Sequence, residues 1–361
     1  MDQRKRLDYF DVAKGIGACL VVLGHLPEAV DIHFRTWIFS FHMPLFFIIS
    51  GMLLSYKKDV DKKFLLLIKK RARTILIPYV SFSIIYMVAV LFAYFQNVIT
   101  PKTILDNLWY VISLYGMNVL WFLPALFFGE LIFLFIMKKF DSKTSKIVIV
   151  VSFTISYFAS VYLNNKEYAA IGRELVGITY FGQLLVVFFR SFIAMSFIVI
   201  GYFLFFLLKE RKRISIFELF LSIALLAINI VIGKKNGGVD MRSLAFKNVF
   251  LYYGAALSGT FSLLLFCKNC YPFHILKYFG KNSLTIMASH NSLTLLYVAT
   301  TFAMYANQYI TRAKDYLYAF NVFAVIMIYV VIVIEIINRF FPFIIGKEYN
   351  RKNGKKKTGI F

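Results

Sequence analysis

Acidic residues, cysteine and proline are scarce in this chain of 361 residues, which has 18 Asp and Glu against 41 Lys and Arg, three cysteines and seven prolines. Three cysteines cannot build a disulfide framework. Cys267 and Cys270 have CxxC spacing, but no second Cys or His pair accompanies them, so a zinc or redox site is not indicated. No stretch rich in Pro, Gly or Ser separates off a soluble module, so we expect one integral domain over residues 1–345 and a short tail.

Apolar residues, in contrast, dominate the chain: 60% of the residues are hydrophobic, 19% are aromatic, and the mean hydropathy is +0.71. A soluble core of this length does not need so much apolar surface, so the composition predicts a polytopic membrane protein. Continuous apolar runs near the length of a helical span recur about ten times, which predicts an all-α fold and argues against a barrel of alternating strands. The expected spans are 12–30, 37–56, 74–95, 119–137, 147–163, 183–208, 216–232, 246–266, 283–305 and 317–345.

The net charge of +23 first suggests a nucleic-acid partner, but the placement of the charge argues otherwise. If the N-terminus is cytoplasmic and the ten spans alternate, 28 Lys and Arg lie on the cytoplasmic side and 10 on the other. This asymmetry follows the positive-inside rule and predicts a multi-pass protein of the cytoplasmic membrane with both termini inside. The basic charge, including that of the cytoplasmic tail 346–361, then reports topology and contact with anionic membrane lipids, and no nucleic-acid partner is expected.

The first span carries two ionisable residues, Lys14 and His25, eleven positions apart. At about 100° per residue, this spacing returns the second side chain to within roughly 20° of the first. The two groups lie about 16 Å apart along the helix axis, roughly half the thickness of a bilayer core. Such groups are costly in hydrocarbon and usually line an interior or a wet path, so they predict a site that works across the membrane.

The second span contains His42, two residues before Pro44. Proline lacks a backbone donor, so the helix is expected to start late or to kink there. This places His42 near the outer surface, on the same side of the membrane as His25. Two interpretations stay open, namely that His42 hydrogen-bonds a freed carbonyl or that it contacts substrate.

A basic cluster that contains Lys70, Arg71 and Arg73 stands where the third span leaves the cytoplasm. One interpretation is a positive-inside anchor. The other is a binding site for a phosphorylated donor, because arginine pairs with phosphate through two parallel hydrogen bonds and several phosphates need several cations.

Two later segments add polar residues within apolar spans. Glu130 follows Trp121 in the fourth span and must be neutral, paired or wet there; Arg190 in the sixth span is its candidate counter-ion. Asn282 is a candidate cap of the ninth span, and His290 lies about two turns further on, either as a packing histidine or as part of a site. No His, Asp or Glu pair shows the spacing of metal ligands, so no metal site is expected.

Together these segments resemble the acyltransferase 3 family of membrane-bound O-acyltransferases, and the resemblance covers nearly the whole chain. Each motif is weak alone, but four in order across ten spans are specific. The segments that carry the resemblance are Leu7, Asp8, Lys14, Gly15 and His25; Phe41 to Phe47 with Ser50 and Gly51; Trp121 to Leu123 with Glu130; and Gly280 to Leu284 with His290.

The chain departs from the family pattern at two positions. The family often has Arg where this chain has Lys14, and its third-helix motif has two arginines three apart, of which Arg71 matches the first while Thr74 occupies the second position beside Arg73. The resemblance implies transfer of an acetyl or related acyl group from acyl-CoA, as a co-substrate and not a bound cofactor, to a sugar hydroxyl of a cell-surface glycan.

On this interpretation the phosphates of cytoplasmic acetyl-CoA bind Arg71, Arg73 and Lys70, and Lys14 lies on the path of the pantetheine arm towards His25. Histidine suits the chemistry because its pKa of about 6.5 lets it accept a hydroxyl proton near neutral pH. His25 is then either the general base or the nucleophile that carries the acyl group. His42, Trp121, Glu130, Asn282 and His290 are candidates for an acceptor site or a structural role. Two alternatives remain: acylation of a small molecule such as an antibiotic or free sugar, and a non-enzymatic glycan transporter or flippase.

Overall fold

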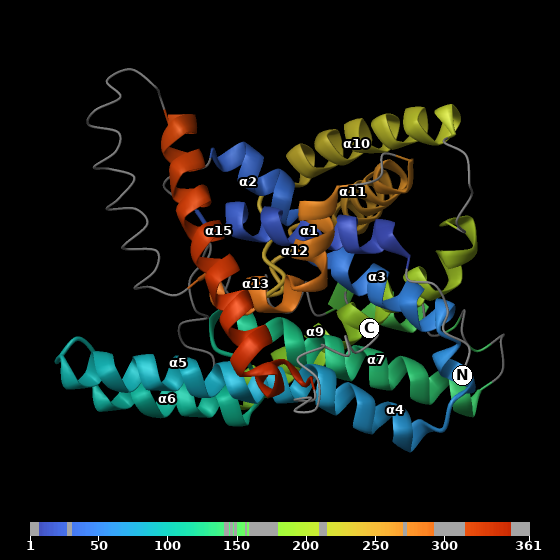
Figure 1. Cartoon of the computed structure of the whole chain (residues 1–361). Helices are drawn as coiled ribbons and strands as arrows, with labels where there is room; N and C mark the ends of the chain where they lie inside the picture. Colours follow the sequence, from blue (N-terminus) through green and yellow to red (C-terminus); the bar gives the residue numbers. More distant parts are fainter. Residues whose placement is uncertain are drawn as a thin grey trace.

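A computed structural model describes residues 7–26, 31–140, 180–208, 215–269, 273–291 and 315–347, with the backbone alone for 315–317, and residues 144, 147, 150–155, 157 and 158. Within these residues the chain is helical, and one β-bridge joins Asp240 to Ala245 (Figure 1). The helices are α1 (Asp8–Gly24), α2 (Ile32–Phe39), α3 (His42–Tyr56), η1 (Asp59–Asp61), α4 (Phe64–Arg71), η2 (Ala72–Leu76), α5 (Ile77–Phe95), α6 (Pro101–Ile112), η3 (Asn118–Trp121), α7 (Phe122–Lys139), α9 (Tyr180–Leu204), η4 (Phe205–Leu208), α10 (Ile216–Asn236), α11 (Val249–Asn269), α12 (His274–Lys281), α13 (Ser283–Ser289), α15 (Asp315–Phe340) and η5 (Pro342–Ile345).

Seven of the described segments are long and apolar enough to cross a membrane, which confirms a helical membrane protein. They are Ile32–Tyr56, Phe64–Phe95, Asn118–Lys139, Tyr180–Leu208, Ile216–Asn236, Val249–Asn269 and Tyr318–Phe340. Each corresponds to one of the ten expected spans. Of the other three, the first is the shorter helix α1, with 17 residues. The span expected at 147–163 is described only in part, and most of the span expected at 283–305 and of the tail 346–361 lies outside the described residues.

The late start of the second span is confirmed. Helix α2 ends at Phe39 and α3 begins at His42, with Ser40 and Phe41 between them. Pro44 falls in the first turn of α3, where a backbone N–H has no partner within the helix and its loss is harmless. The break therefore places His42 at the N-terminus of α3.

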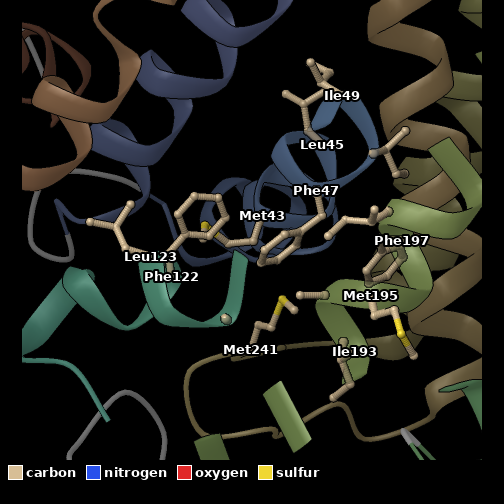
Figure 2. Close-up of a cluster of buried hydrophobic side chains, with 14 of the residues drawn as sticks. Met43, Leu45, Phe47, Ile49, Phe122, Leu123, Ile193, Met195, Phe197 and Met241 are labelled. Carbon is tan, nitrogen blue, oxygen red and sulfur yellow. The ribbon is translucent and has the colours of Figure 1, made fainter. Parts of the chain in front are cut away.

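The main cluster of buried apolar side chains extends over many helices and includes the contact between α3, α7 and α9. Figure 2 shows Phe47 of α3, Phe122 of α7 and Phe197 of α9 gathered in this core, and all three side chains are buried. The ring centroids of Phe47 and Phe122 are 4.8 Å apart, within the range of favourable aromatic pairs. This packing fixes α3 and α7, whose polar residues line the site described below.

Glycines allow two pairs of helices to touch through their backbones. A Cβ atom on Gly15 would lie 1.9 Å from a carbonyl oxygen of α12, and one on Gly280 would lie 1.7 Å from a carbonyl oxygen of α1. Helices α3 and α9 meet in the same way at Gly51 and Gly201. Small residues allow such close approach in membranes. As a result α12 and α13, from the last third of the chain, lie directly beside α1 (Figure 1).

Candidate active site

Two pockets lie at opposite ends of helices α1 and α3. His25 at the end of α1 and His42 at the start of α3 line the first, which we call the His25 pocket. Lys14 near the start of α1 and Lys57 just past the end of α3 line the second, which we call the Lys14 pocket. Helices α2 and α3 together form a segment long and apolar enough to cross a membrane, and the two pockets lie at opposite ends of this segment. Met287 lines both pockets and separates them.

His25 contacts His290, which does not line the pocket, and the hydrogen bonds around the two rings define their tautomers. His290 Nδ1 lies 3.0 Å from the Ile286 carbonyl oxygen and 2.8 Å from that of Met287, so this nitrogen carries the proton. His290 Nε2 is then an acceptor, 3.3 Å from His25 Nδ1, which also lies 2.7 Å from the Val21 carbonyl oxygen. Two acceptors around His25 Nδ1 require a proton there. The other nitrogen of His25, Nε2, therefore keeps its lone pair for chemistry.

His42 makes a backbone contact and also lines the pocket. Its Nδ1 lies 2.9 Å from the Ile38 carbonyl oxygen in the helix break, and the ring is buried. The Phe39 ring lies between the two histidines, with its centroid 5.1 Å from that of His42 and 6.0 Å from that of His25. His42 therefore makes the hydrogen bond to a freed carbonyl that the sequence predicted as one alternative. Because its ring also lines the pocket, the other alternative, a contact with substrate, is compatible with this hydrogen bond.

A loop of residues 237–248 forms one wall of the His25 pocket. Backbone hydrogen bonds of 2.9 Å in both directions between Asp240 and Ala245 close this loop, which contributes Arg242 to the pocket. The fully buried Arg190 of α9 donates through Nε to the Arg242 carbonyl oxygen at 2.7 Å, and through Nη1 to the Tyr115 carbonyl oxygen at 2.8 Å. Its guanidinium also lies over the Tyr115 ring, 4.4 Å from the centroid. Arg190 therefore ties two loops together behind the pocket.

The expected pairing of Glu130 with Arg190 is wrong. Glu130 lies in the Lys14 pocket, where its Oε2 is 2.6 Å from Arg71 Nε and its Oε1 accepts a hydrogen bond from Ser50. Arg71 also donates to Asp59 at 2.8 Å. The packing of α7 against η2 decides the partner, because it brings the start of the third span to Glu130.

The Lys14 pocket is rich in cations. Lys14, Lys57, Arg71 and Lys281 line it, against one carboxylate, Glu130. Lys14 also forms an ion pair of 3.0 Å with the buried Asp11, one turn earlier on α1. Apart from the hydroxyl residues Ser50, Thr74 and Ser283, its remaining lining is apolar, and side chains of α7 and α13 lead toward Met287. The arrangement fits an elongated ligand with an anionic head and an uncharged arm.

Charge at the edge of this pocket shifts two pKa values. Burial lowers the pKa of Lys57 to about 7, and the positive charges of Lys70 and Arg71 act in the same direction. Burial alone would raise the pKa of Asp59, but the hydrogen bond from Lys62 and the charges of Arg71 and Lys70 hold it below its usual value. Crowded cations with too few carboxylates create a positive potential that favours an anion.

The other expected donor-site residues lie beside this pocket and do not line it. Lys70 Nζ is 3.7 Å from Asp59. Arg73 Nε donates to the Gly346 carbonyl oxygen at 2.9 Å, which fixes η2 against the C-terminal part of the described chain. Thr74, at the position where the family motif has its second arginine, does line the pocket. Arg71 is thus the member of the predicted cluster that lines the Lys14 pocket.

The remaining candidates divide between the two ends of the site. Trp121 lines the His25 pocket, as the hypothesis of an acceptor site requires. Asn282 lines neither pocket; it donates to the Tyr278 carbonyl oxygen at 3.0 Å and accepts from Asn338 at 3.0 Å, which joins α12, α13 and α15. Its contacts are those of a structural residue.

Four cations that no prediction from the sequence assigned to a site also line the pockets, namely Arg35, Lys57, Arg242 and Lys281. No motif marks Arg35, Lys57 or Arg242, which lie in segments between the expected spans. Lys281 lies within the segment Gly280 to Leu284 that carries the family resemblance, and this is the signal that could have found it. Among the described residues, no group of three His, Cys, Asp or Glu side chains is placed to hold a metal ion.

Comparison with known proteins agrees with this architecture. The sequence model of the acyltransferase 3 family, described as an acyltransferase domain, matches residues 7–341, a range that contains both pockets. The chain belongs to this family and is an acyltransferase of the membrane. No curated protein and no solved structure matches the chain.

Proposed function

We propose that this protein transfers an acetyl or related acyl group from cytoplasmic acyl-CoA to a sugar hydroxyl of a cell-surface polysaccharide or of its lipid-linked precursor. The observation that carries the proposal is the pair of pockets at opposite ends of one candidate span, one lined by four cations and the other by histidines, with Met287 between them. Family membership supports an acyltransferase over a transporter.

In this proposal the Lys14 pocket is cytoplasmic and binds the donor. The phosphates of acyl-CoA lie against Lys57, Arg71 and Lys281, which supply charge-assisted hydrogen bonds. The pantetheine arm follows the apolar wall toward Met287, past Lys14. Methionine is unbranched and flexible, so its side chain can move aside for the arm. The thioester then lies at the His25 pocket, where the acceptor sugar binds.

The chemistry depends on His25 Nε2. In the direct route this nitrogen removes the proton of the sugar hydroxyl while the oxygen attacks the thioester carbonyl; the C–S bond breaks, and the CoA thiolate takes up the proton. In the alternative route His25 Nε2 attacks the thioester carbonyl, and the C–S bond breaks to release the CoA thiolate. The sugar oxygen then attacks the acyl-histidine, the bond from Nε2 to the acyl carbon breaks, and the hydroxyl proton passes to the thiolate. Both routes need Nδ1 protonated and Nε2 free, as the hydrogen bonds from His25 to Val21 and His290 favour.

The test is transfer of label from acetyl-CoA to glycans by the purified full-length protein. His25→Ala should lower acyl transfer by roughly 10²–10⁴-fold, the usual loss on removing a general base, while acetyl-CoA still binds. The matched control is Cys19→Ala, which shortens a half-buried side chain on the same helix outside both pockets. Near-normal turnover by a folded His25→Ala variant would rule out this mechanism, and a protein that binds no acetyl-CoA would rule out the proposed donor.

A further inference from the structure

We infer that the acceptor carries a negative charge, a carboxylate or a phosphate close to the acylated sugar, which Arg35 and Arg242 bind in the His25 pocket. The inference rests on the proposed function, because it assigns the acceptor to this pocket. It adds a substrate class, since a neutral glycan offers no partner for two guanidinium groups.

Arg35 is held with its terminal nitrogens available. Its Nε donates to the Gly24 carbonyl oxygen at 2.9 Å, and its guanidinium carbon lies 5.3 Å from the centroid of the Phe39 ring. These two contacts fix the plane of the guanidinium beside His25. The two terminal nitrogens form no hydrogen bond with any residue in the described part of the chain, yet the side chain lines the pocket.

Arg242 is anchored through its backbone and not through its side chain. Its N–H donates to Asp240 at 2.8 Å, and its carbonyl oxygen accepts from the buried Arg190. The guanidinium forms no hydrogen bond or ion pair with a residue that the structure describes. The buried Arg190 thus holds the backbone of Arg242 in place at the pocket wall. A guanidinium in a fixed position favours recognition of an anion.

The one carboxylate of the pocket does not satisfy these cations. Asp240 Oδ1 accepts from the backbone N–H of Arg242, and Oδ2 accepts from the Ser243 hydroxyl at 2.7 Å, so both oxygens bond within their own loop. Two guanidinium groups against one carboxylate leave the pocket with a net positive charge. Arg35, Asp240 and Arg242 line the same pocket as His25, so the anion would bind next to the reacting histidine.

Three sugars that share a ring but differ at one carbon form the test. They are methyl β-D-glucoside, methyl β-D-glucuronoside and methyl β-D-glucoside 6-phosphate, which place a hydroxyl, a carboxylate and a phosphate at the same position. Their binding to the full-length protein in nanodiscs is measured by ligand-observed NMR titration, and acetyl transfer to each is measured with labelled acetyl-CoA. We expect at least one anionic sugar to bind about tenfold or more tightly than the neutral glucoside, as charge-assisted hydrogen bonds predict.

Two variants connect this preference to the pocket. Arg242→Gln should reduce the ratio of anionic to neutral affinity to within about threefold, and Arg35→Gln should reduce it in the same direction. Lys235→Gln is the matched control, because it removes the same charge from an exposed residue on the helix that leads into the loop. The control should keep the full ratio. Thermal unfolding and gel filtration establish that each variant is folded.

The outcomes separate this inference from the proposed function. Equal binding of the three sugars, including no binding by any of them, overturns the inference, as does a preference that survives in both arginine variants. Acetyl-CoA binding is measured on the same preparations. A preparation that prefers the anionic sugars but does not bind acetyl-CoA would contradict the proposed function, while the anion site in the His25 pocket would still be supported. The relative ranking of glucuronoside and 6-phosphate identifies which anion the acceptor carries.

Discussion

His25 and His290 stand ring to ring, with Nε2 of His290 3.3 Å from Nδ1 of His25, although 265 positions separate them in the chain. The ring centroids are 5.0 Å apart and the planes meet at 62°. The two carbonyl oxygens at His290 Nδ1 decide the tautomer of that ring, and through it the tautomer of His25. The last third of the chain thus determines which nitrogen of the first helix can react.

His290 is therefore predicted to be a positioning residue. His290→Ala should lower the kcat of acyl transfer, with the KM for acetyl-CoA unchanged, because His25 loses an orienting acceptor but the donor pocket is intact. A loss smaller than that of His25→Ala is expected, since the Val21 carbonyl oxygen still accepts from His25 Nδ1. Steady-state kinetics of the two variants provide the comparison.

The conservative variant His290→Gln distinguishes positioning from packing. Its side-chain oxygen can accept the hydrogen bond from His25, so kcat should recover in part relative to alanine. Equal activity of the alanine and glutamine variants would mean that the contact between the two histidines has no role in turnover.

Arg71→Ala is predicted to weaken both stability and donor binding. The variant leaves the buried Glu130 without its cation, and breaking such a pair destabilises a protein by about 3–5 kcal/mol. The affinity for acetyl-CoA should fall about ten- to a hundredfold, because phosphate contacts are charge-assisted. Thermal unfolding and acetyl-CoA binding measure the two effects separately.

The double variant Arg71→Ala with Glu130→Gln separates these two losses. Neutral glutamine still accepts from Ser50 and needs no cation, so the double variant should regain much of the stability. Its affinity for acetyl-CoA should stay low. Recovery of donor affinity together with stability would place the CoA phosphates away from Arg71.

Donor binding is predicted to weaken as the pH rises through about 7, the value to which burial lowers the pKa of Lys57. Below this pH the ammonium is charged and attracts phosphate; above it the amine is neutral and the attraction is lost. Bound phosphate favours the charged form, so binding near pH 8 should take up a proton. Titration calorimetry in buffers of different ionisation enthalpy detects this uptake. Lys57→Arg stays charged at any of these pH values, so its acetyl-CoA binding should not depend on pH in this range. If the variant keeps the same pH dependence as the unaltered protein, another group is responsible for it.

Met287 is predicted to control passage between the pockets. Met287→Trp should abolish transfer but leave acetyl-CoA binding in place, because the bulky ring closes the path beyond the phosphate site. Met287→Ala should join the pockets and raise both the hydrolysis of acetyl-CoA and the use of longer acyl donors such as butyryl-CoA. Met52→Ala is the control, since it truncates a fully buried methionine of the core. Equal behaviour of the two alanine variants would show that the effect at 287 is one of general packing.

The orientation of the two pockets is open to direct measurement. Single cysteines at Lys63, at the start of α4, and at Lys234, at the end of α10, occupy exposed positions that the charge asymmetry assigns to opposite sides. A membrane-impermeant maleimide should label Lys234→Cys in intact cells and Lys63→Cys only after permeabilisation, with the unaltered chain as background. The reverse pattern would turn the Lys14 pocket outward and exclude cytoplasmic acyl-CoA as its ligand.

Local rules were sufficient for the features that lie within one helix. Helical geometry alone predicts that Lys14 and His25 share one face, and each lines a pocket toward its own end of α1. The break before Pro44 follows from the missing backbone donor alone. Composition and the length of the apolar runs were likewise enough to predict a helical membrane protein.

Contacts between distant segments were beyond the reach of these rules. Charge alone cannot choose between Arg71 and Arg190 as the partner of Glu130, because the choice depends on how η2 packs on α7. The wall formed by residues 237–248 has neither helical nor strand periodicity, and its shape comes from hydrogen bonds to Arg190 and within the loop. Such positions carry no pattern until the fold brings their partners near.

The backbone contact between Gly15 and α12 has a consequence for how the protein is made. Helix α1 leaves the ribosome first, whereas α12 and α13 follow only after most of the chain has been synthesised. Until they arrive, α1 has neither the partner for its glycine face nor the ring that orients His25. We therefore expect the capacity for acyl transfer to appear late in biogenesis, and a chain that stops before residue 274 should lack it.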